Sequence, residues 1–280
     1  MRTIELNELR SIQLEILNAF DSFCTENGLI YFLTGGTLLG AIRHKGYIPW
    51  DDDIDVAMPR ADYEKLVNIS KSLPFPYCIE KYSAEKEKKK PYIYTYLKAY
   101  DLRTTLVEFP NMMNYSSGVY IDIFPLDNLP NDLNERKKAY RTVRKYVDLG
   151  CRCNVAYYIK KNMKISSTRD FFKKVFYLMY DFVRALFPPN FFIIKADTLA
   201  RNLSIQETRY VGCIVAGYGE REAMLVKDVF PPKPVEFEGK YFPGFNNPDA
   251  YLSQVYGDYM SLPPEEKRMS NHIFKAYWKD

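Results

Sequence analysis

Histidine is almost missing from this chain, and cysteine is sparse and scattered. Two histidines in 280 residues leave little material for a zinc site. The five cysteines are Cys24, Cys78, Cys151, Cys153 and Cys213. Cys151 and Cys153 have the wrong spacing for a redox CxxC pair or a zinc knuckle. We therefore expect free thiols in a reducing, cytoplasmic compartment, since no apolar signal segment precedes them.

The sequence also lacks a long, uncharged apolar run. A membrane-spanning helix needs about 18 such residues, and the nearest approach, residues 170–195, contains several charges. They include Lys173, Lys174, Asp181 and Arg184. Apolar residues recur there at helical spacing, and we expect this helix to pack on the core. The alternative is an interfacial helix beside the basic residues at 160–164, in peripheral contact with the inner face of the membrane.

A strong excess of one charge sign is absent as well. The net charge of +4 suits a nucleotide or another phosphate ligand, but it argues against a dedicated nucleic-acid binder. No long polar or Pro/Gly-rich tract is present, so disorder is not expected. With 47% hydrophobic and 16% aromatic residues, the chain can build a large core.

Periodicity and turn residues predict an α/β (α+β) chain with a mixed sheet flanked by helices. Helices are expected at 6–26, from 38 onward, at 59–70 and from 131 to about 210; strands are expected at 29–33, 53–58, 92–100, 103–108 and 118–124. A tight turn is expected at 34–37, and Pro125 and Pro130 are expected to end the last strand. We divide the chain into a catalytic core, 1–130, and a mainly helical region, 131–280, that completes the same domain.

The stretch IPWDDDIDV, residues 48–56, concentrates four aspartates in five positions. If residues 53–58 form a strand, Ile54 and Val56 enter the core and Asp53 and Asp55 project together on the other face. Two such carboxylates repel each other, and a divalent cation relieves the repulsion. Mg²⁺ or Mn²⁺ suits this arrangement, because these ions combine carboxylates with substrate phosphate oxygens.

Asp122 is a third candidate, because it interrupts the apolar strand YIDIF. A lone aspartate within a strand is unfavourable unless it has a partner. Three carboxylates from two strands would form a metal site, or a metal site with a general base.

The sequence TGGT, residues 34–37, adds a candidate phosphate site. Glycines before a helix expose backbone N–H groups at its N-terminus, and we include Gly35, Gly36 and Thr37 among the substrate-binding residues. Positive charge for phosphates is available from Arg43, His44 and Lys45, although a solvated helix end explains these residues equally well. Trp50 is a candidate for stacking on a base or sugar, with packing beside the loop as the alternative.

Acidic runs of this kind also occur in several other classes of site. An EF-hand loop requires glycine where Val56 stands and a terminal glutamate where Asp62 stands. A haloacid-dehalogenase motif follows a buried strand, whereas this run follows Pro49-Trp50. An Asp-x-Asp glycosyltransferase stays open, although little chain precedes the pair for a nucleotide-binding half. A solvated acidic loop also stays open.

Three stretches of this chain together resemble the LicD family, which includes bacterial phosphocholine transferases and fukutin-related proteins. These are FLTGGTLLGAIRHKGYIPWDDDIDVAMPRADYEKL (32–66), GVYIDIFPLD (118–127) and YLSQVYGDYMSLPPEEKR (251–268). They occur in the family's order, whereas residues 150–215 match least.

The resemblance implies a nucleotidyltransferase-like fold with Gly35 and Gly36 in the glycine turn and Asp53, Asp55 and Asp122 as the catalytic and metal-binding carboxylates. It implies transfer of a phospho-alcohol, phosphocholine first, from a CDP-linked donor to a sugar hydroxyl of lipopolysaccharide, teichoic acid or capsule. Whether Asp122 binds metal or accepts a proton stays open, and Asp51 and Asp52 have no assigned role. The competing hypotheses are a sugar-nucleotide glycosyltransferase and a non-catalytic scaffold of the same fold. Arg268 and His272 are expected at the surface.

Overall fold

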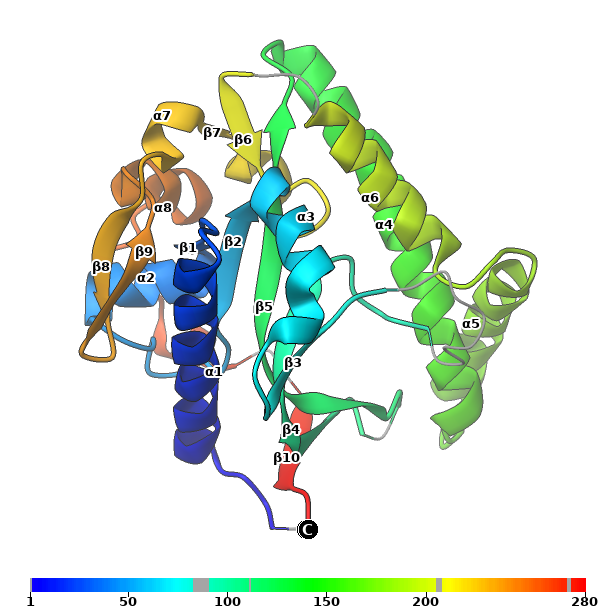
Figure 1. Ribbon diagram of the computed structural model, residues 1–280. Coiled ribbons are helices and arrows are strands. Elements are labelled where there is room, and N and C mark those ends of the chain that lie inside the picture. The colour runs from blue at the N-terminus through cyan, green and yellow to red at the C-terminus, as the bar shows by residue number, and fades with distance from the viewer. Residues whose placement is uncertain (1, 83–90, 111, 205–207, 271–272) are drawn as a thin grey trace.

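A computed structural model describes residues 2–82, 91–110, 112–204, 208–270 and 273–280. A mixed sheet lies at the centre, with α1 and α3 across one face and α4–α6 to one side (Figure 1). The α-helices are α1 (Leu6–Glu26), α2 (Gly35–His44), α3 (Arg60–Ile69), α4 (Leu133–Asn162), α5 (Thr168–Ala185), α6 (Phe191–Leu203), α7 (Val226–Val229) and α8 (Pro248–Tyr256), with 3-10 turns at Ser70–Ser72, Gly219–Glu222 and Glu265–Lys267. The strands are β1 (Phe32–Leu33), β2 (Asp55–Pro59), β3 (Tyr77–Glu80), β4 (Leu97–Glu108), β5 (Tyr115–Leu129), β6 (Tyr210–Gly212), β7 (Met224–Leu225), β8 (Lys233–Phe237), β9 (Lys240–Gly244) and β10 (Phe274–Trp278).

Strand β5 organises the sheet. It pairs in parallel with β2 on one side and antiparallel with β4 on the other, and β1 and β10 extend the two sides. β3 pairs with β4. β6 pairs with the C-terminal end of β5, and β7 pairs with β6. The β8–β9 hairpin forms a separate two-stranded sheet. This arrangement confirms the expected mixed α/β fold with flanking helices.

Helix α1 has the predicted bounds, because its signals are local. Leu9, Ile16 and Phe20 follow the helical period and are buried in the main core. Asn27 ends the helix, and Gly28 adopts a φ of +59° that glycine tolerates. The prediction of free thiols is also confirmed, since all five cysteines are unpaired.

Several predicted boundaries were wrong near the acidic run. The strand expected over 29–33 contains only Phe32–Leu33. The turn expected over 34–37 is instead the N-cap residue Thr34 followed by the first residues of α2. β2 begins at Asp55, so Asp53 lies in the preceding loop and not on a strand. Ile54 and Val56 are nevertheless fully buried, as the alternation predicted.

Pro125 does not end β5, contrary to the prediction. The N–H of Asp122 donates to Ile54 of the neighbouring chain segment, so the N–H groups of odd-numbered residues face the opposite side. On that side, β4 pairing stops at Ile123 and β6 pairing starts at Asp127. Pro125 lies in this gap, where a missing N–H breaks no sheet hydrogen bond.

The expectation that residues 170–195 pack on the core was wrong for most of the segment, although Phe192 and Ile193 near its end are buried. The segment forms α5 and the start of α6, with a break at Pro188-Pro189. Within α5 only Asp181 is buried, whereas Phe172 and Phe182 are 66% and 67% exposed. The polar side of α5, not its apolar side, faces α4.

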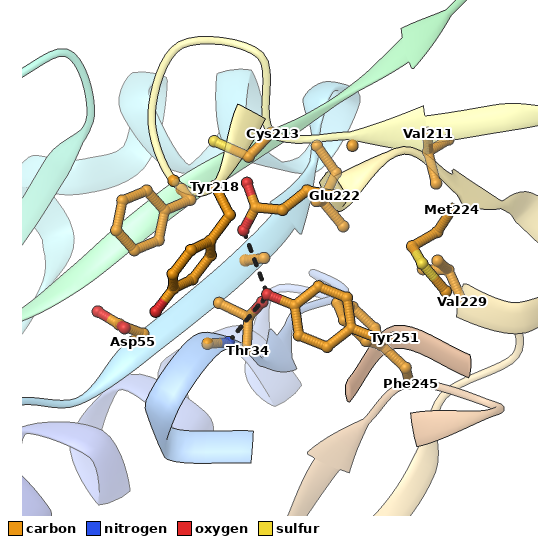
Figure 2. Close-up of a pocket in the computed structure, with 16 residues that line it drawn as sticks. Thr34, Asp55, Val211, Cys213, Tyr218, Glu222, Met224, Val229, Phe245 and Tyr251 are labelled. Carbon is orange, nitrogen blue, oxygen red and sulfur yellow. Dashed lines mark hydrogen bonds between the residues drawn. The ribbon is translucent and has the colours of Figure 1, made fainter. Parts of the chain in front are cut away.

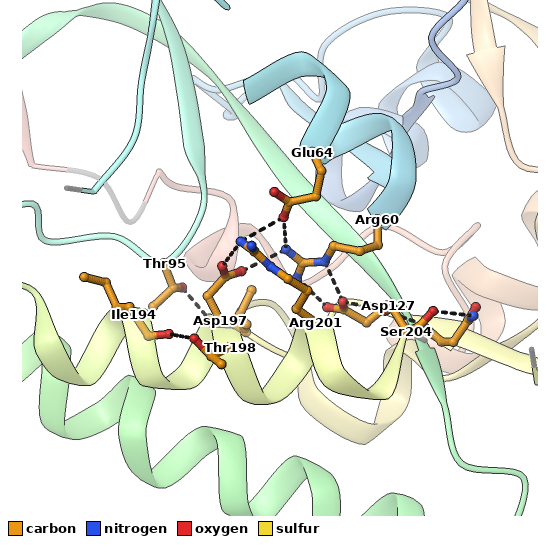
Figure 3. Close-up of polar contacts among 11 residues, drawn as sticks. Arg60, Glu64, Thr95, Asp127, Ile194, Asp197, Thr198, Arg201 and Ser204 are labelled. Atoms are coloured by element: carbon orange, nitrogen blue, oxygen red, sulfur yellow. Dashed lines mark hydrogen bonds and ion pairs between the residues drawn. The ribbon is translucent and has the colours of Figure 1, made fainter. Parts of the chain in front are cut away.

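A buried ionic network links α3, β5 and α6 (Figure 3). Arg60 donates to both carboxylate oxygens of Asp127 at 2.7 and 2.9 Å and to Asp197 at 2.8 Å. Asp127 is fully buried and Arg60 nearly so. Because breaking such a pair leaves a buried charge alone, the network couples the helical region to the sheet.

Candidate active site

The register of β2 and β5 brings two of the predicted carboxylates together. Asp55 and Asp122 are direct partners in the parallel ladder, so their side chains lie next to each other on one face of the sheet. Asp55 is the first residue of β2 and is partly exposed, whereas Asp122 is 7% exposed. Local sequence placed each aspartate on a strand, but only the pairing makes them neighbours.

The loop before β2 adds three more carboxylates. Oxygens of Asp51, Asp52 and Asp53 all lie within 4.8 Å of one another, which is close enough to share a metal ion. Asp52 is buried and accepts a 2.6 Å hydrogen bond from Ser270. Asp51 and Asp53 are partly exposed.

Helix α1 fixes the shape of this acidic loop. The guanidinium of Arg10 donates to the carbonyl oxygens of Ile48, Pro49 and Asp51 at 2.6–3.1 Å. Gln13 donates to the carbonyl of Asp52 at 2.9 Å. These bonds occupy loop carbonyls that a longer β2 would use for pairing, which accounts for Asp53 lying outside the strand.

Gly35 and Gly36 let the start of α2 approach the carboxylates. A Cβ on Gly35 would lie 2.7 Å from Oδ2 of Asp55, and one on Gly36 would lie 2.7 Å from Oδ2 of Asp51. Gly35 also has a φ of +55°. Thr37 is buried, and its hydroxyl accepts the backbone N–H of Asp55 at 2.8 Å. The glycines therefore leave room at the helix start, while Thr37 holds β2.

Negative charge accumulates around Asp55. Desolvation, together with the charges of Asp53, Asp122 and Asp51, raises the pKa of Asp55 well above its ordinary value, and Lys98 offsets only part of this. A divalent cation would remove the repulsion, and the donor set consists entirely of carboxylate oxygens, which Mg²⁺ prefers. The residues present therefore fit a magnesium or manganese ion.

Asp122 has a partner that the sequence did not reveal. Nζ of Lys98, on β4, lies 2.6 Å from Oδ1 of Asp122, and Lys98 is only 1% exposed. The ammonium also lies 3.1 Å from the ring centroid of Tyr120 and 4.0 Å from that of Tyr94. Lys98 thus supplies a buried positive charge on the β4 side of the carboxylates.

A cleft of about 620 Å³ opens in front of the acidic loop. Its lining includes Gly36, Arg43, Trp50, Asp51, Asp53, Asp55, Tyr218, Tyr256, Asp258 and Lys267. The cleft thus unites Gly36, Arg43, Trp50, Asp53 and Asp55 from the predicted set.

The three predicted basic residues at the end of α2 have different surroundings. Arg43 lines the cleft and donates to the Tyr259 carbonyl at 2.6 Å and to His44 Nε2 at 2.9 Å. Desolvation and the charge of Arg43 lower the pKa of His44, so this imidazole is neutral at pH 7. Lys45 is exposed and caps the helix with a φ of 59°. Among the described lining residues, neither His44 nor Lys45 contributes to the cleft.

Two further basic residues were expected at the surface. The guanidinium of Arg268 lies 5.8 Å from the ring centroid of Trp50, and His272 lies outside the described residues.

Behind Asp55 is a smaller, mostly apolar cavity of about 50 Å³ (Figure 2). The hydroxyl of Tyr251 lies 3.2 Å from Glu222 Oε1 and accepts the N–H of Gly35 at 3.3 Å. Burial raises the pKa of Glu222 from 4.5 to about 8, against a lowering contribution from the Tyr251 hydroxyl. Tyr218 points its hydroxyl toward Asp55 in Figure 2. Glu222 and Tyr251 thereby support the start of α2 from behind.

Sequence reasoning missed Arg10, Lys98, Tyr218, Glu222 and Lys267. Arg10 reaches the loop across about forty positions, and Lys98 meets Asp122 across 24. Lys98 did carry one signal, because a lysine within an apolar strand needs a partner as much as Asp122 does.

Comparison with known proteins gives the class of this site. Residues 28–147, which contain Gly35, Gly36 and the five aspartates at 51, 52, 53, 55 and 122, match the family described as "LicD/FKTN/FKRP, nucleotidyltransferase domain". The chain is 33% identical over 283 residues to the lipopolysaccharide cholinephosphotransferase LicD of Haemophilus influenzae, covering 99% of both chains. An uncharacterised protein of Rickettsia prowazekii is 31% identical over 115 residues, covering 34% of this chain and 39% of that protein. The chain belongs to the LicD family.

Proposed function

We propose that this protein transfers phosphocholine from a CDP-linked donor to a hydroxyl of a glycan or glycolipid, using a divalent metal. The main support is the relative that matches over its full length, which is a lipopolysaccharide cholinephosphotransferase. In addition, carboxylates of this chain line a cleft. We place the reaction in the cytoplasm, where the enzyme would bind the CDP-linked donor. The acceptor would lie at the inner face of the membrane.

The carboxylates of Asp53, Asp55 and Asp122 would hold Mg²⁺ or Mn²⁺; Asp55 and Asp122 are ladder partners, and a carboxylate oxygen of Asp51 lies within 4.8 Å of one of Asp53. The ion would neutralise charge on the donor's phosphate oxygens. Gly36 and the start of α2 would receive a phosphate against backbone N–H groups, with Arg43 and Lys267 as cleft cations.

In the transfer, the acceptor oxygen bonds to the phosphorus of phosphocholine, and the bond from this phosphorus to the bridging oxygen breaks. CMP leaves with that oxygen, and the hydroxyl proton passes to a carboxylate of the site. In such a reaction the protein contributes mainly by positioning the reactants. The hydrogen bonds that hold the acidic loop and the start of α2 are consistent with this role.

Aromatic side chains favour choline over a polyol as the head group. Tyr218 and Tyr256 form an edge-to-face pair at 5.3 Å in the cleft, with Trp50 and Asp258 also lining it. Quaternary ammonium groups bind to aromatic faces and to nearby carboxylates. Ribitol or glycerol would gain little from these faces.

A thermal-shift titration tests the proposal with CMP, CDP-choline, CDP-ribitol, CDP-glycerol, UDP-glucose and GDP-mannose, each with and without Mg²⁺. A ligand at about 100 times its dissociation constant stabilises the fold by about 2.7 kcal/mol. We expect metal-dependent stabilisation by CDP-choline, followed by CMP release when an acceptor glycan is added. Stabilisation by a sugar nucleotide alone would favour a glycosyltransferase, and no response to any of these would favour a scaffold.

A further inference from the structure

Helix α5 is oriented with its apolar side toward solvent. Phe172, Met179, Phe182 and Leu186 are 66%, 61%, 67% and 65% exposed, and all four lie on one side of the helical period. Surface helices normally bury such a stripe. The exposed apolar surface, which we call the α5 face, comprises Phe171, Phe172, Val175, Phe176, Met179, Phe182 and Leu186.

Polar contacts fix this orientation. Asp181, the buried residue of α5, pairs with Lys160 of α4 at 2.7 Å and with Arg184 at 2.8 Å. Lys174 donates to the carbonyl of Met163 at 2.8 Å, and Arg152 of α4 donates to the Tyr180 hydroxyl at 3.0 Å. Rotating α5 to bury its apolar side would break the bonds to Lys160, Met163 and Arg152, so the exposure of the α5 face is built into the packing.

The segment that carries the α5 face is rich in positive charge. Residues 160–195 contain eight basic and two acidic side chains, a net charge of +6, whereas the whole chain has only +4. Both acidic residues have local partners, Asp170 with serines and Asp181 with Lys160 and Arg184. Lys161, Lys164 and Lys173 are exposed, and Lys173 directly follows Phe172 in the helix.

We infer that the α5 face docks on the surface of an anionic lipid bilayer, with the helix lying in the plane of the interface. Large apolar side chains flanked by lysines and arginines are the chemistry that enters a charged headgroup layer. Within the described residues no helix has the length and hydropathy to cross a bilayer. Docking would hold the molecule at the surface by one face only. It does not depend on the proposed transferase activity.

A second copy of this chain fits the α5 face less well. Two such faces in contact would bring two surfaces of strong positive charge together, and like charges across an interface are costly. An anionic headgroup layer instead complements both the charge and the apolar side chains. Charge complementarity therefore favours the bilayer.

Vesicle co-sedimentation tests this inference with no donor or acceptor present, so its result is separate from that of the transferase assay. The vesicles contain phosphatidylcholine alone or phosphatidylcholine with phosphatidylglycerol. The test variant is Phe172→Ser/Phe182→Ser. The matched control is Leu133→Ser/Tyr241→Ser, which removes two apolar side chains that are 52% and 69% exposed elsewhere.

We expect the natural chain and the control to bind anionic vesicles at least tenfold more tightly than zwitterionic ones. The test variant should bind anionic vesicles at least tenfold more weakly, with an unchanged thermal midpoint. Raising the salt from about 0.1 M to about 1 M should weaken binding, because the Debye length falls from about 10 Å to about 3 Å. In Phe182→Trp, adding anionic vesicles should shift the tryptophan emission to shorter wavelength.

Three results would overturn the inference. They are failure of the natural chain to bind anionic vesicles, equal binding by the test variant, and an equal loss in the control. A dimer in sedimentation velocity that disappears in Phe172→Ser/Phe182→Ser, without lipid, would assign the α5 face to a second copy instead.

Discussion

Gly35 and Gly28 have nearly the same backbone conformation but different surroundings, which makes them a matched pair. Gly35 has a φ of +55° and would place a Cβ 2.7 Å from the Asp55 carboxylate, whereas Gly28 has a φ of +59° and open space around it. Each alanine substitution should cost about 1–2 kcal/mol of stability from the left-handed backbone alone.

We therefore expect Gly35→Ala to lower turnover at least tenfold and Gly28→Ala to leave it within about twofold. The difference would come from displacement of Asp55, since a misplaced catalytic group is costly. CMP release and thermal unfolding measure the two effects. Equal activity of the two variants would show that the contact between Gly35 and Asp55 is unimportant for turnover.

Replacing a carboxylate of the site should abolish activity without lowering stability. Asp53→Asn and Asp55→Asn should each abolish turnover by removing a metal ligand. Without metal, each should leave the thermal midpoint unchanged or raise it, because like-charge repulsion is relieved. Asp148→Asn, at a 46% exposed side chain paired with Arg144, is the control. Full activity in either Asp53→Asn or Asp55→Asn would contradict the metal site.

Glu222 should make stability depend on pH. Its pKa is raised from 4.5 to about 8 in the folded state, so between these pH values the folded protein keeps a proton that the unfolded chain has lost. Stability should therefore fall by about 3–5 kcal/mol as the pH rises from about 4.5 to about 8, at 1.36 kcal/mol per pKa unit. Urea unfolding across this range should show a smaller fall in Glu222→Gln than in the natural chain.

At the scale of elements, α1 serves as the support of the acidic loop. Arg10 binds three loop carbonyls, so Arg10→Met leaves acceptors without their donor, at about 1–3 kcal/mol. We expect this variant to need a higher Mg²⁺ concentration for half-maximal turnover. Arg2→Met, which loses an exposed pair with Glu8 and a contact with the Trp278 ring but none with the loop, should not. An unchanged Mg²⁺ requirement in Arg10→Met would show that α1 does not position the metal ligands.

Elements with local signals were predictable from the sequence, and elements set by pairing were not. The bounds of α1 followed from its period and its Asn27-Gly28 end. Pro125 misled the prediction because its effect depends on which side of β5 lacks a neighbour. The amphipathic pattern of α5 was visible, but the direction of its apolar side depends on distant contacts such as Lys160 with Asp181.

The residues of the candidate site also fall into a group that was predictable from the sequence and a group that was not. Asp53, Asp55, Asp122 and the glycines were found because they are unusual in their local sequence. Lys98 and Arg10 act on these residues from other elements, so only the fold reveals them. Thr37 was predicted as a substrate contact, and the structure places it behind the site, holding Asp55.

At the scale of the whole molecule, the sheet and the helical region meet through the Arg60 network, and we expect them to unfold together. Arg60 of α3 pairs with Asp127 of β5 and Asp197 of α6. Tryptophan fluorescence reports the sheet side, because the two tryptophans are Trp50 and Trp278. Far-UV circular dichroism reports strongly on α4, which with 30 residues is the longest of the described helices.

In the natural chain the two signals should change at the same urea concentration. Arg60→Met should cost about 3–5 kcal/mol, because it leaves Asp127 buried without its cation and leaves Asp197 with Arg201 of its own helix. In this variant the dichroism should be lost at lower urea than the fluorescence, since the helical region loses its main ionic link to the sheet. Arg144→Met, which breaks only an exposed pair on α4, should keep the two transitions together. Separate transitions in the natural chain would instead show that residues 131–280 contain an independently folding unit, and the Arg60 network would then be an interface between domains.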